Sequence, residues 1–256
     1  LGISNLLCGA EDFYETSTNM AVLNNVDHAE LRYNPQFGSA FGDCANRMPL
    51  LPTEFAEAQR DHPILFAEQP DAGLIAVALL GLESGENLHF DGRNWGDAYI
   101  PALHRRGPFA LQVQKDASGA AQDLLIDVDL NDARLGNDEG FPLFKPHGGN
   151  SEMLDLISST LLTIFEGSEI TAPFTDMLNE LGLLVPAAID VDLGDGRSIE
   201  IRDHMIIDAA AFQSLTASQL KQLNDAGFLV PTVHAMASVA NIQRLIDRKT
   251  RGAAGA

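Results

Sequence analysis

The apolar run LIAVALLGL at residues 74–82 decides the fold. It lacks the polar alternation of a strand with one wet face, so it predicts a central strand that is covered on both sides. Further strand-like runs lie at residues 64–67, 87–90, 109–114 and 123–130, and Gly, Asp and Pro residues separate them. The first half of the chain therefore predicts a sheet built mainly from antiparallel neighbours.

The second half of the chain has helical spacing. Ser151 is placed to cap a helix that runs to about residue 165, and Phe174, Leu178 and Leu181 mark another helix. A β-hairpin is expected at residues 188–207, where strand-like runs flank Gly194-Asp195-Gly196. Further helices are expected at residues 208–215, 218–226 and 233–249. One short helix, after Pro52, is expected in the first half.

These patterns predict one α+β domain over residues 20–250. An antiparallel-rich sheet from the N-terminal half is covered by C-terminal helices, and the hairpin is an insertion. A barrel-like curl of the first half is the alternative. A split into two domains near residues 142–150 is disfavoured, because the first half needs the helices to bury its second face. Residues 1–19 are expected to be a disordered N-terminal extension, and residues 251–256 a flexible tail.

The formal net charge of -20, from 36 acidic and 16 basic residues, is the main anomaly of the composition. Such a field repels phosphate backbones and anionic lipids, so nucleic acid is not an expected partner. The longest apolar run, residues 72–82, is about half of a membrane-spanning helix, so membrane insertion is not expected either.

The cysteines and the N-terminal segment bear on the compartment. Cys8 and Cys44 do not make a disulfide framework. The segment LGISNLLCGAEDFYETSTN lacks the basic start and the long apolar core of a secretory signal. We therefore expect a soluble cytoplasmic protein, with association with the cell surface as the alternative.

The segment on either side of Pro101 carries the candidate binding residues. Trp95 and Tyr99 can form the flat apolar walls of a cleft, in which one of the two neighbouring arginines holds a carboxylate. The competing interpretation is that each arginine is committed to an internal ion pair. His104 is expected at the surface and not as a base. The predicted ligand-binding set is Glu86, Asn87, Trp95, Tyr99, Arg105 and Arg106.

Metal sites have weaker support in the sequence. His89 and Asp91 have the H-x-D spacing of a non-haem iron site, with His147 as the distal ligand. Asp91 is also an expected turn residue. An arginine that would bind the 2-oxoglutarate cosubstrate is expected shortly after the distal histidine, and the residues after His147 do not include one. The leading prediction therefore contains no metal and no cofactor.

Other motifs are incomplete or absent. Asp127, Asp129 and Asn131 fit the first slots of a calcium loop, but Asp132 stands where that loop needs glycine. An acidic turn in water is the expected structure. Neither a G-x-S-x-G nucleophile elbow nor a phosphate-binding glycine loop occurs. No catalytic residues are predicted.

Several short segments, taken in order, resemble the bacterial SapC family over residues 20–249. They are VLNN (22–25), LPTEF (51–55), ALLG and GENL (within 78–88), YIPALHRRGPF (99–109), PLF (142–144), IDVDL (189–193) and SVANIQRLIDRK (238–249). The resemblance brings no established catalytic residues with it.

The resemblance implies an accessory or binding protein without autonomous catalysis. Family genes lie near genes for outer-membrane receptors and modifying enzymes, which implies a role in nutrient uptake or modification, with an acidic small molecule or a protein as partner. Two alternatives remain open. One is a non-haem Fe(II)-dependent oxygenase that uses His89, Asp91 and His147, and the other is a surface-layer-associated structural protein.

Overall fold

The computed structural model describes residues 19–70, 72–115, 121–192 and 198–254. Of the expected N-terminal extension, residues 1–18 lie outside the described residues. The segment 251–254, expected to be a flexible tail, belongs to the last helix, α8 (Asn241–Ala254), and residues 255–256 lie outside the description.

A five-stranded antiparallel sheet is the main sheet of the fold. Its strand order is β10 (Leu184–Pro186), β13 (Met205–Ile207), β4 (Ile64–Gln69), β5 (Gly73–Leu79) and β3 (Arg47–Leu50). β4 and β5 pair over their whole length as a tight hairpin, from Ile64 opposite Ala78 to Gln69 opposite Gly73. The expected central strand is therefore confirmed, and strands from the second half of the chain extend the sheet.

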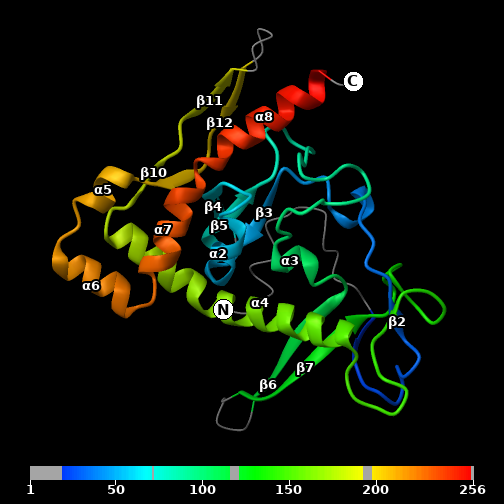
Figure 1. Cartoon of the computed structure of the whole chain (residues 1–256). Coiled ribbons are helices and arrows are strands. Elements are labelled where there is room, and N and C mark those ends of the chain that lie inside the picture. Colours follow the sequence, from blue (N-terminus) through cyan, green and yellow to red (C-terminus); the bar gives the residue numbers. More distant parts are fainter. Residues whose placement is uncertain (1–18, 71, 116–120, 193–197, 255–256) are drawn as a thin grey trace.

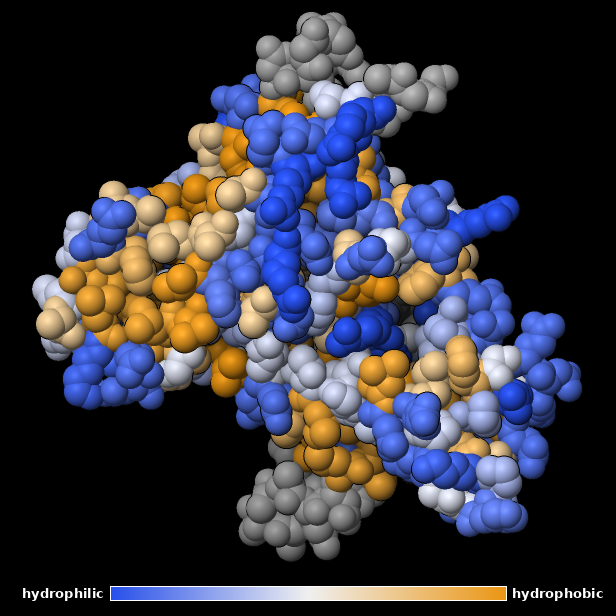
Figure 2. Space-filling model, in the orientation of Figure 1, coloured by the Kyte–Doolittle hydropathy of each residue, from blue (hydrophilic) through white to orange (hydrophobic). Residues whose placement is uncertain are grey.

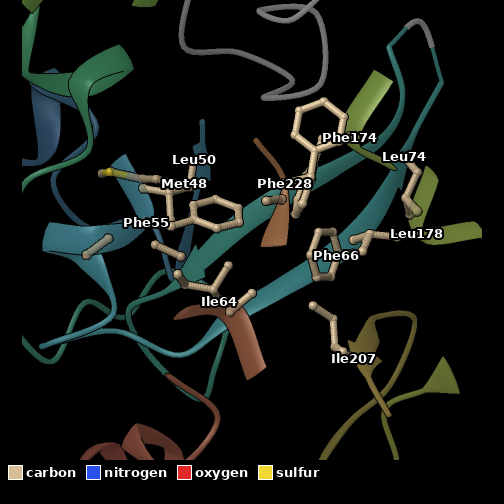
Figure 3. Close-up of a cluster of buried hydrophobic side chains, with 14 of the residues drawn as sticks. Met48, Leu50, Phe55, Ile64, Phe66, Leu74, Phe174, Leu178, Ile207 and Phe228 are labelled. Carbon is tan, nitrogen blue, oxygen red and sulfur yellow. The ribbon is translucent and has the colours of Figure 1, made fainter. Parts of the chain in front are cut away.

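Both faces of β4 and β5 are covered, because successive side chains of a strand point to opposite sides. Phe66 on one face packs with Phe174 and Leu178 from α4 (Glu152–Glu180), and Phe228 lies in the same cluster (Figure 3). On the other face, Leu65 and its neighbours pack against the hairpin of β11 (Ile189–Asp192) and β12 (Ser198–Ile201), and against α8. Two layers thus exclude water from the centre of the sheet.

A second apolar cluster lies beside a smaller sheet. This sheet has the order β1 (Met20–Val22), β7 (Ala121–Asp129) and β6 (Phe109–Lys115). Phe109 and Val128 from this sheet pack with Ile157, Leu161 and Ile164 of α4. A third, short sheet joins β8 (Leu135–Gly136), β2 (Arg32–Tyr33) and β9 (Phe141–Pro142). The described strands form separate open sheets and no closed barrel, so the barrel-like alternative is wrong.

Helix α4 connects the two clusters. Its 29 residues span about 43 Å, and Figure 1 shows it running past the main sheet towards β6 and β7. The sequence predicted two helices here, and the structure has one. Pro173 lies inside the helix, but Pro173 and Glu169, whose carbonyl loses its amide partner, are both exposed, so water can replace the missing hydrogen bond.

Two other expectations are corrected by side chains that bind backbone. Residues 87–90 were expected to form a strand, but the Asn87 side chain donates to the Asp43 carbonyl and accepts from the His89 amide, which holds a turn. The helix expected at 233–249 is divided into α7 (Leu229–Ser238) and α8. At this break, the side-chain amide of Asn241 donates to the backbone carbonyls of Gln59 and His62.

The expected hairpin is shorter than the sequence predicted. β11 and β12 pair as expected, but residues 205–207 leave the hairpin and join the main sheet as β13. The chain changes direction at Asp203, which has a left-handed conformation with φ of 60°. β13 thus belongs to the main sheet, whereas β12, the strand before it in the sequence, pairs with β11.

The remaining helices are short. They are η1 (Ser39–Phe41), η2 (Pro52–Glu54), α2 (Phe55–Ala58), α3 (Ala102–Arg105), α5 (Ala209–Gln213) and α6 (Ala217–Asp225). The short helix expected after Pro52 and the helices expected near 208–226 are therefore confirmed.

The surface is uneven in polarity. Figure 2 shows apolar side chains gathered over α5, α6 and α7, at the left of that view. Leu220 on α6 and Val230 and Val233 on α7 are exposed, with 60% of Val230 accessible to solvent. The helical end is thus more apolar than the rest of this face.

Both edges of the main sheet carry a proline. Pro49 lies in the edge strand β3, and Pro186 lies in the edge strand β10. Proline has no amide hydrogen to donate and is confined in sheets to edge positions of this kind. Each edge strand is also short.

Gly167 offers a test of how closely α4 approaches η2. A Cβ at this position would lie 2.6 Å from Thr53 Oγ1 and 2.7 Å from Leu51 Cβ. We expect Gly167→Ala to lower the free energy of unfolding by about 1–3 kcal/mol, measured by urea denaturation. Helix propensity alone would stabilise the variant by about 1 kcal/mol, so an increase in stability would contradict the close contact.

Candidate functional site

Asp43 is a fully buried carboxylate that accepts three hydrogen bonds. Oδ2 accepts from the Gly38 amide at 2.6 Å, and Oδ1 accepts from Trp95 Nε1 at 2.5 Å and from His104 Nε2 at 2.8 Å. Burial would raise the pKa of Asp43, but the hydrogen bonds from His104, Gly38 and Trp95 outweigh it and lower the pKa. Asp43 is therefore ionised at neutral pH.

Glu54 is a second buried carboxylate with three donors. Oε1 accepts from the Tyr99 hydroxyl at 2.8 Å and from the Ala102 amide at 2.6 Å, and Oε2 accepts from the Leu51 amide at 3.0 Å. Burial raises the pKa of Glu54, and these hydrogen bonds offset only part of that effect. The carboxylate joins η2 to the segment around Pro101.

The two carboxylates together position α3. This helix is a single turn, which is too short to be stable alone in water. Glu54 binds its first amide, that of Ala102, and Asp43 binds the imidazole of His104 near its end. Two side chains of α3, His104 and Arg105, are thereby held beside α4.

A pocket of about 110 Å³ lies between α3, the segment after β2 and the N-terminal half of α4. Most of its wall is apolar, and its polar lining residues include three basic side chains, those of His104, Arg105 and Arg134. The lining residues are Tyr33, Pro35, Gln36, Phe37, Ile100, His104, Arg105, Arg134, Met153, Leu156, Ile157 and Thr160. The pocket thus combines an apolar body with a cationic wall.

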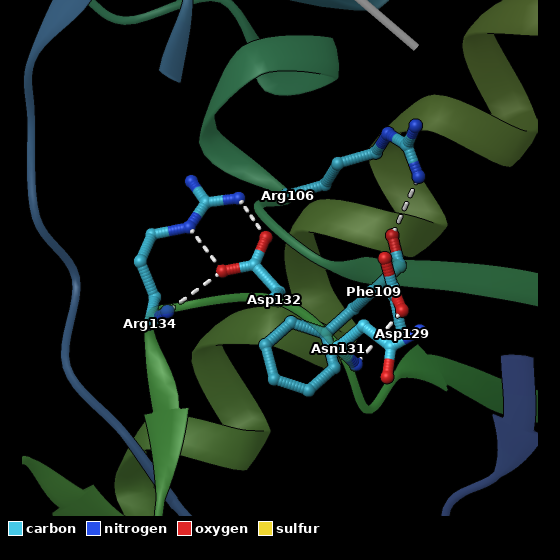
Figure 4. A network of polar contacts seen from close by, with 6 residues as sticks. All are labelled: Arg106, Phe109, Asp129, Asn131, Asp132 and Arg134. Atoms are coloured by element: carbon cyan, nitrogen blue, oxygen red, sulfur yellow. Dashed lines mark hydrogen bonds and ion pairs between the residues drawn. The ribbon is translucent and has the colours of Figure 1, made fainter. Parts of the chain in front are cut away.

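The two arginines in this wall, Arg134 and Arg105, differ in whether they form an ion pair with a described carboxylate. Arg134 makes a bidentate ion pair with Asp132 (Figure 4). Its guanidinium carbon lies 4.6 Å from the centre of the Phe41 ring. Arg105 is exposed, and no described carboxylate lies within ion-pair distance of its guanidinium. Its guanidinium carbon lies 5.5 Å from the centre of the Tyr99 ring. Arg105 can therefore bind an external anion without breaking an ion pair to a described residue.

His104 lies in the pocket wall and is mostly buried, with 11% of its side chain exposed. Its expected place at the open surface is therefore wrong, because Asp43 holds the ring inward. Nε2 is bonded to Asp43, and the ring lies 5.7 Å from the Trp95 ring. Nδ1 has no hydrogen bond to a described residue and is not among the buried atoms without a partner. Nδ1 is thus the ring nitrogen that solvent reaches.

The structure distributes the six predicted binding residues over several places. Arg105 lines the pocket, and Tyr99 stacks behind it. Trp95 and Asn87 lie deeper, where both bind Asp43, through its carboxylate and its carbonyl respectively.

Arg106 and Glu86 point elsewhere. Arg106 donates to the Phe109 carbonyl at 2.7 Å (Figure 4), and Glu86 pairs with Lys249 on α8. Neither lines the pocket.

Sequence reasoning missed several residues of this site. Asp43, Glu54 and Arg134 come from segments far from Pro101 in the chain, and nothing in their local sequence marks them as buried or as pocket residues. For Glu54, the one available signal was its place in the segment LPTEF.

The comparison with protein families now identifies the chain. The family model described as SapC matches residues 23–245. The chain belongs to the SapC family. Comparison with curated proteins and with solved structures finds no match. In this SapC protein, two segments on which the resemblance rests meet at one carboxylate, because Glu54 of LPTEF binds Tyr99 and Ala102 of YIPALHRRGPF.

No helix in the described ranges combines the length and apolarity that crossing a membrane would need.

The residues of the iron hypothesis do not converge. His89 is buried, whereas Asp91 is exposed and accepts from the amides of Arg93 and Asn94, as a turn residue does. His147 is exposed. Among the described residues, no three His, Cys, Asp or Glu side chains are grouped to hold a metal ion.

His62 and His89 form a buried pair of imidazoles whose ring centres lie 4.6 Å apart. His62 Nε2 contacts the Tyr99 carbonyl at 2.6 Å, but His62 Nδ1 and both ring nitrogens of His89 have no hydrogen-bond partner among the residues that the structure describes. Burial lowers the pKa of both residues, that of His89 to about 3. Both rings are therefore neutral at pH 7.

Removal of the Asp43 carboxylate tests its structural role. Asp43→Ala leaves one buried donor, Trp95 Nε1, and two part-buried donors, those of Gly38 and His104, without their acceptor, so we expect the free energy of unfolding to fall by about 3 kcal/mol. Urea denaturation followed by the fluorescence of Trp95, the only tryptophan, measures this loss. The pKa of Asp43 is lower in the folded protein than in the unfolded chain. The extra stability of the wild type is therefore complete above about pH 4, and it declines as the pH falls through the pKa of Asp43 in the folded protein. Asp97→Ala, at an exposed position, is the control, and equal stability of the two variants would contradict the assignment.

The buried imidazole of His89 predicts a pH dependence of stability. The unfolded chain takes up protons below about pH 6.5 while the folded ring does not, so stability falls as the pH is lowered. We expect His89→Phe to reduce this slope by up to about 1.4 kcal/mol per pH unit between pH 6 and pH 4. Denaturation curves at several pH values measure the slope. His147→Gln, at an exposed residue, should leave it unchanged, and an unchanged slope in His89→Phe would disprove the prediction.

Proposed function

We propose that this SapC-family protein is a non-catalytic accessory protein that binds a small organic acid in the pocket beside α3. The observation that carries the proposal is the position of Arg105, in the wall of an apolar pocket, with no described carboxylate in ion-pair distance. The accessory role in nutrient uptake or modification is the one that the family resemblance implies. A cytoplasmic setting is supported by Cys44, which makes no disulfide with any described residue.

The net charge of the protein makes the pocket selective. With a formal charge of -20, the molecule as a whole repels anions, so an anion can bind only where local cations outweigh that field. In the pocket, His104 and Arg134 each face an internal carboxylate, Asp43 and Asp132. Arg105 has no described carboxylate within ion-pair distance; it interacts with Glu54 only electrostatically, at longer range, and with the Tyr99 side chain.

The shape and polarity of the wall describe the rest of the ligand. Phe37, Ile100, Leu156 and Ile157 offer apolar contact on several sides. A ligand with one carboxylate and a compact hydrocarbon or aromatic body would bury its apolar part there and place its charge at Arg105. Benzoate and hexanoate have this form and serve as probes.

Arg105→Ala tests the proposal directly. Loss of charge-assisted hydrogen bonds should weaken benzoate binding by about 10- to 100-fold, measured by isothermal titration calorimetry. The control is Arg93→Ala, which removes the same charge at an exposed position outside the pocket and should leave the affinity within about twofold.

Two results would contradict the proposal. One is that neither benzoate nor hexanoate binds to the wild type. The other is that the two arginine variants lose affinity to the same extent, which would assign the effect to net charge.

A further inference from the structure

We propose that His104 takes up a proton when the organic acid binds, so that the ligand carboxylate pairs with an imidazolium as well as with Arg105. This inference rests on the proposed function of the pocket. It adds that one proton binds together with each ligand carboxylate, and that His104 Nδ1 receives this proton.

The hydrogen bonds of Asp43 determine which nitrogen of His104 carries hydrogen. Oδ1 of Asp43 already accepts from Trp95 Nε1, and it lies 2.8 Å from His104 Nε2. The carboxylate is ionised and has no proton to donate, so Nε2 must be the donor. Whenever the ring is neutral, its lone pair is therefore on Nδ1, the nitrogen that is left for a ligand in the pocket.

A lone pair on Nδ1 cannot bind a carboxylate, because two acceptors repel each other. Protonation of Nδ1 turns this repulsion into a charge-assisted hydrogen bond. The imidazolium would then lie between two carboxylates, that of Asp43 on Nε2 and that of the ligand on Nδ1. The same arrangement stabilises the charged histidine in Asp-His pairs of enzymes.

Charges of both signs lie around His104 in the pocket. Asp43 favours the imidazolium, whereas the guanidinium groups of Arg105 and Arg134 in the same wall disfavour it. Asp132 is paired with Arg134, and Tyr33 contributes a neutral phenol, whose pKa is raised by burial.

Helix α4 adds no charge to this balance. It contributes Met153, Leu156, Ile157 and Thr160 to the pocket, and none of them titrates. A ligand carboxylate therefore supplies the negative charge that tips the balance towards the protonated ring.

The step is a simple proton transfer. One proton moves from the buffer to His104 Nδ1 for each carboxylate bound, and no covalent bond of the ligand changes. Binding that takes up a proton becomes tighter as the pH falls, by at most tenfold per pH unit.

Calorimetry in paired buffers tests the inference. Benzoate is titrated into the full-length protein at pH 7.5 in phosphate and in Tris, whose ionisation enthalpies differ. We expect the apparent enthalpies to differ by an amount that corresponds to uptake of up to one proton per benzoate, and the affinity to rise between pH 8.5 and pH 6.5. His104→Gln should bind benzoate without proton uptake, whereas His147→Gln, at an exposed residue outside the pocket, should behave as the wild type.

The outcomes separate this inference from the function on which it rests. Benzoate binding with the same enthalpy in both buffers would overturn the role of His104 and leave the binding proposal standing. Undiminished proton uptake in His104→Gln would also overturn it. Absence of binding to the wild type would overturn the proposed function itself. The wild-type titrations decide whether a proton is taken up, so the test does not depend on how well the variant folds.

Discussion

Two carboxylates that are removed from water, Asp43 and Glu54, place the strongest constraint on this structure. A buried charge destabilises a fold unless donors surround it, and each of these groups has three. Two donors in each set come from a distant segment of the chain: Trp95 and His104 for Asp43, and Tyr99 and Ala102 for Glu54. Satisfying the two charges therefore brings η1, η2 and α3 together, and it leaves a one-turn helix at a defined position beside α4.

The arrangement of the pocket follows from that constraint. Because Glu54 and Asp43 hold α3 near its start and its end, Arg105 and His104 project from a fixed backbone. The opposite wall is α4, which is held in turn by the apolar clusters at its two ends. A site built on such supports needs little ordering when a ligand binds. If the pocket binds a ligand as proposed, recognition and stability depend on the same hydrogen bonds.

The sequence predicted those features that periodicity and turn chemistry control. The unbroken apolar run of β5 predicted a strand buried on both faces, and the α+β class and the β11–β12 hairpin were predicted correctly. The errors occur where tertiary contacts decide. Pro173 does not end α4, because water can replace its missing hydrogen bond, and Asn241 divides a helix by binding carbonyls of a different segment.

The candidate site was predicted only where its residues are close in sequence. Trp95, Tyr99 and Arg105 attracted attention because they cluster around Pro101, and only the last of them lines the pocket. The acids that orient them could not be predicted, because a buried and a solvated aspartate look the same in sequence. His104 was misjudged for this reason, since its role depends on Asp43, which lies 61 residues away.

The prolines at the two borders of the main sheet limit how this protein can associate. Pro49 and Pro186 interrupt the rows of amide hydrogens that an incoming strand would need, so growth of the sheet by strand addition from another chain is obstructed on either side. A partner or a second copy must instead recognise side chains, for example on the apolar helical end. The same feature protects a molecule rich in aliphatic strands against fibril-like stacking.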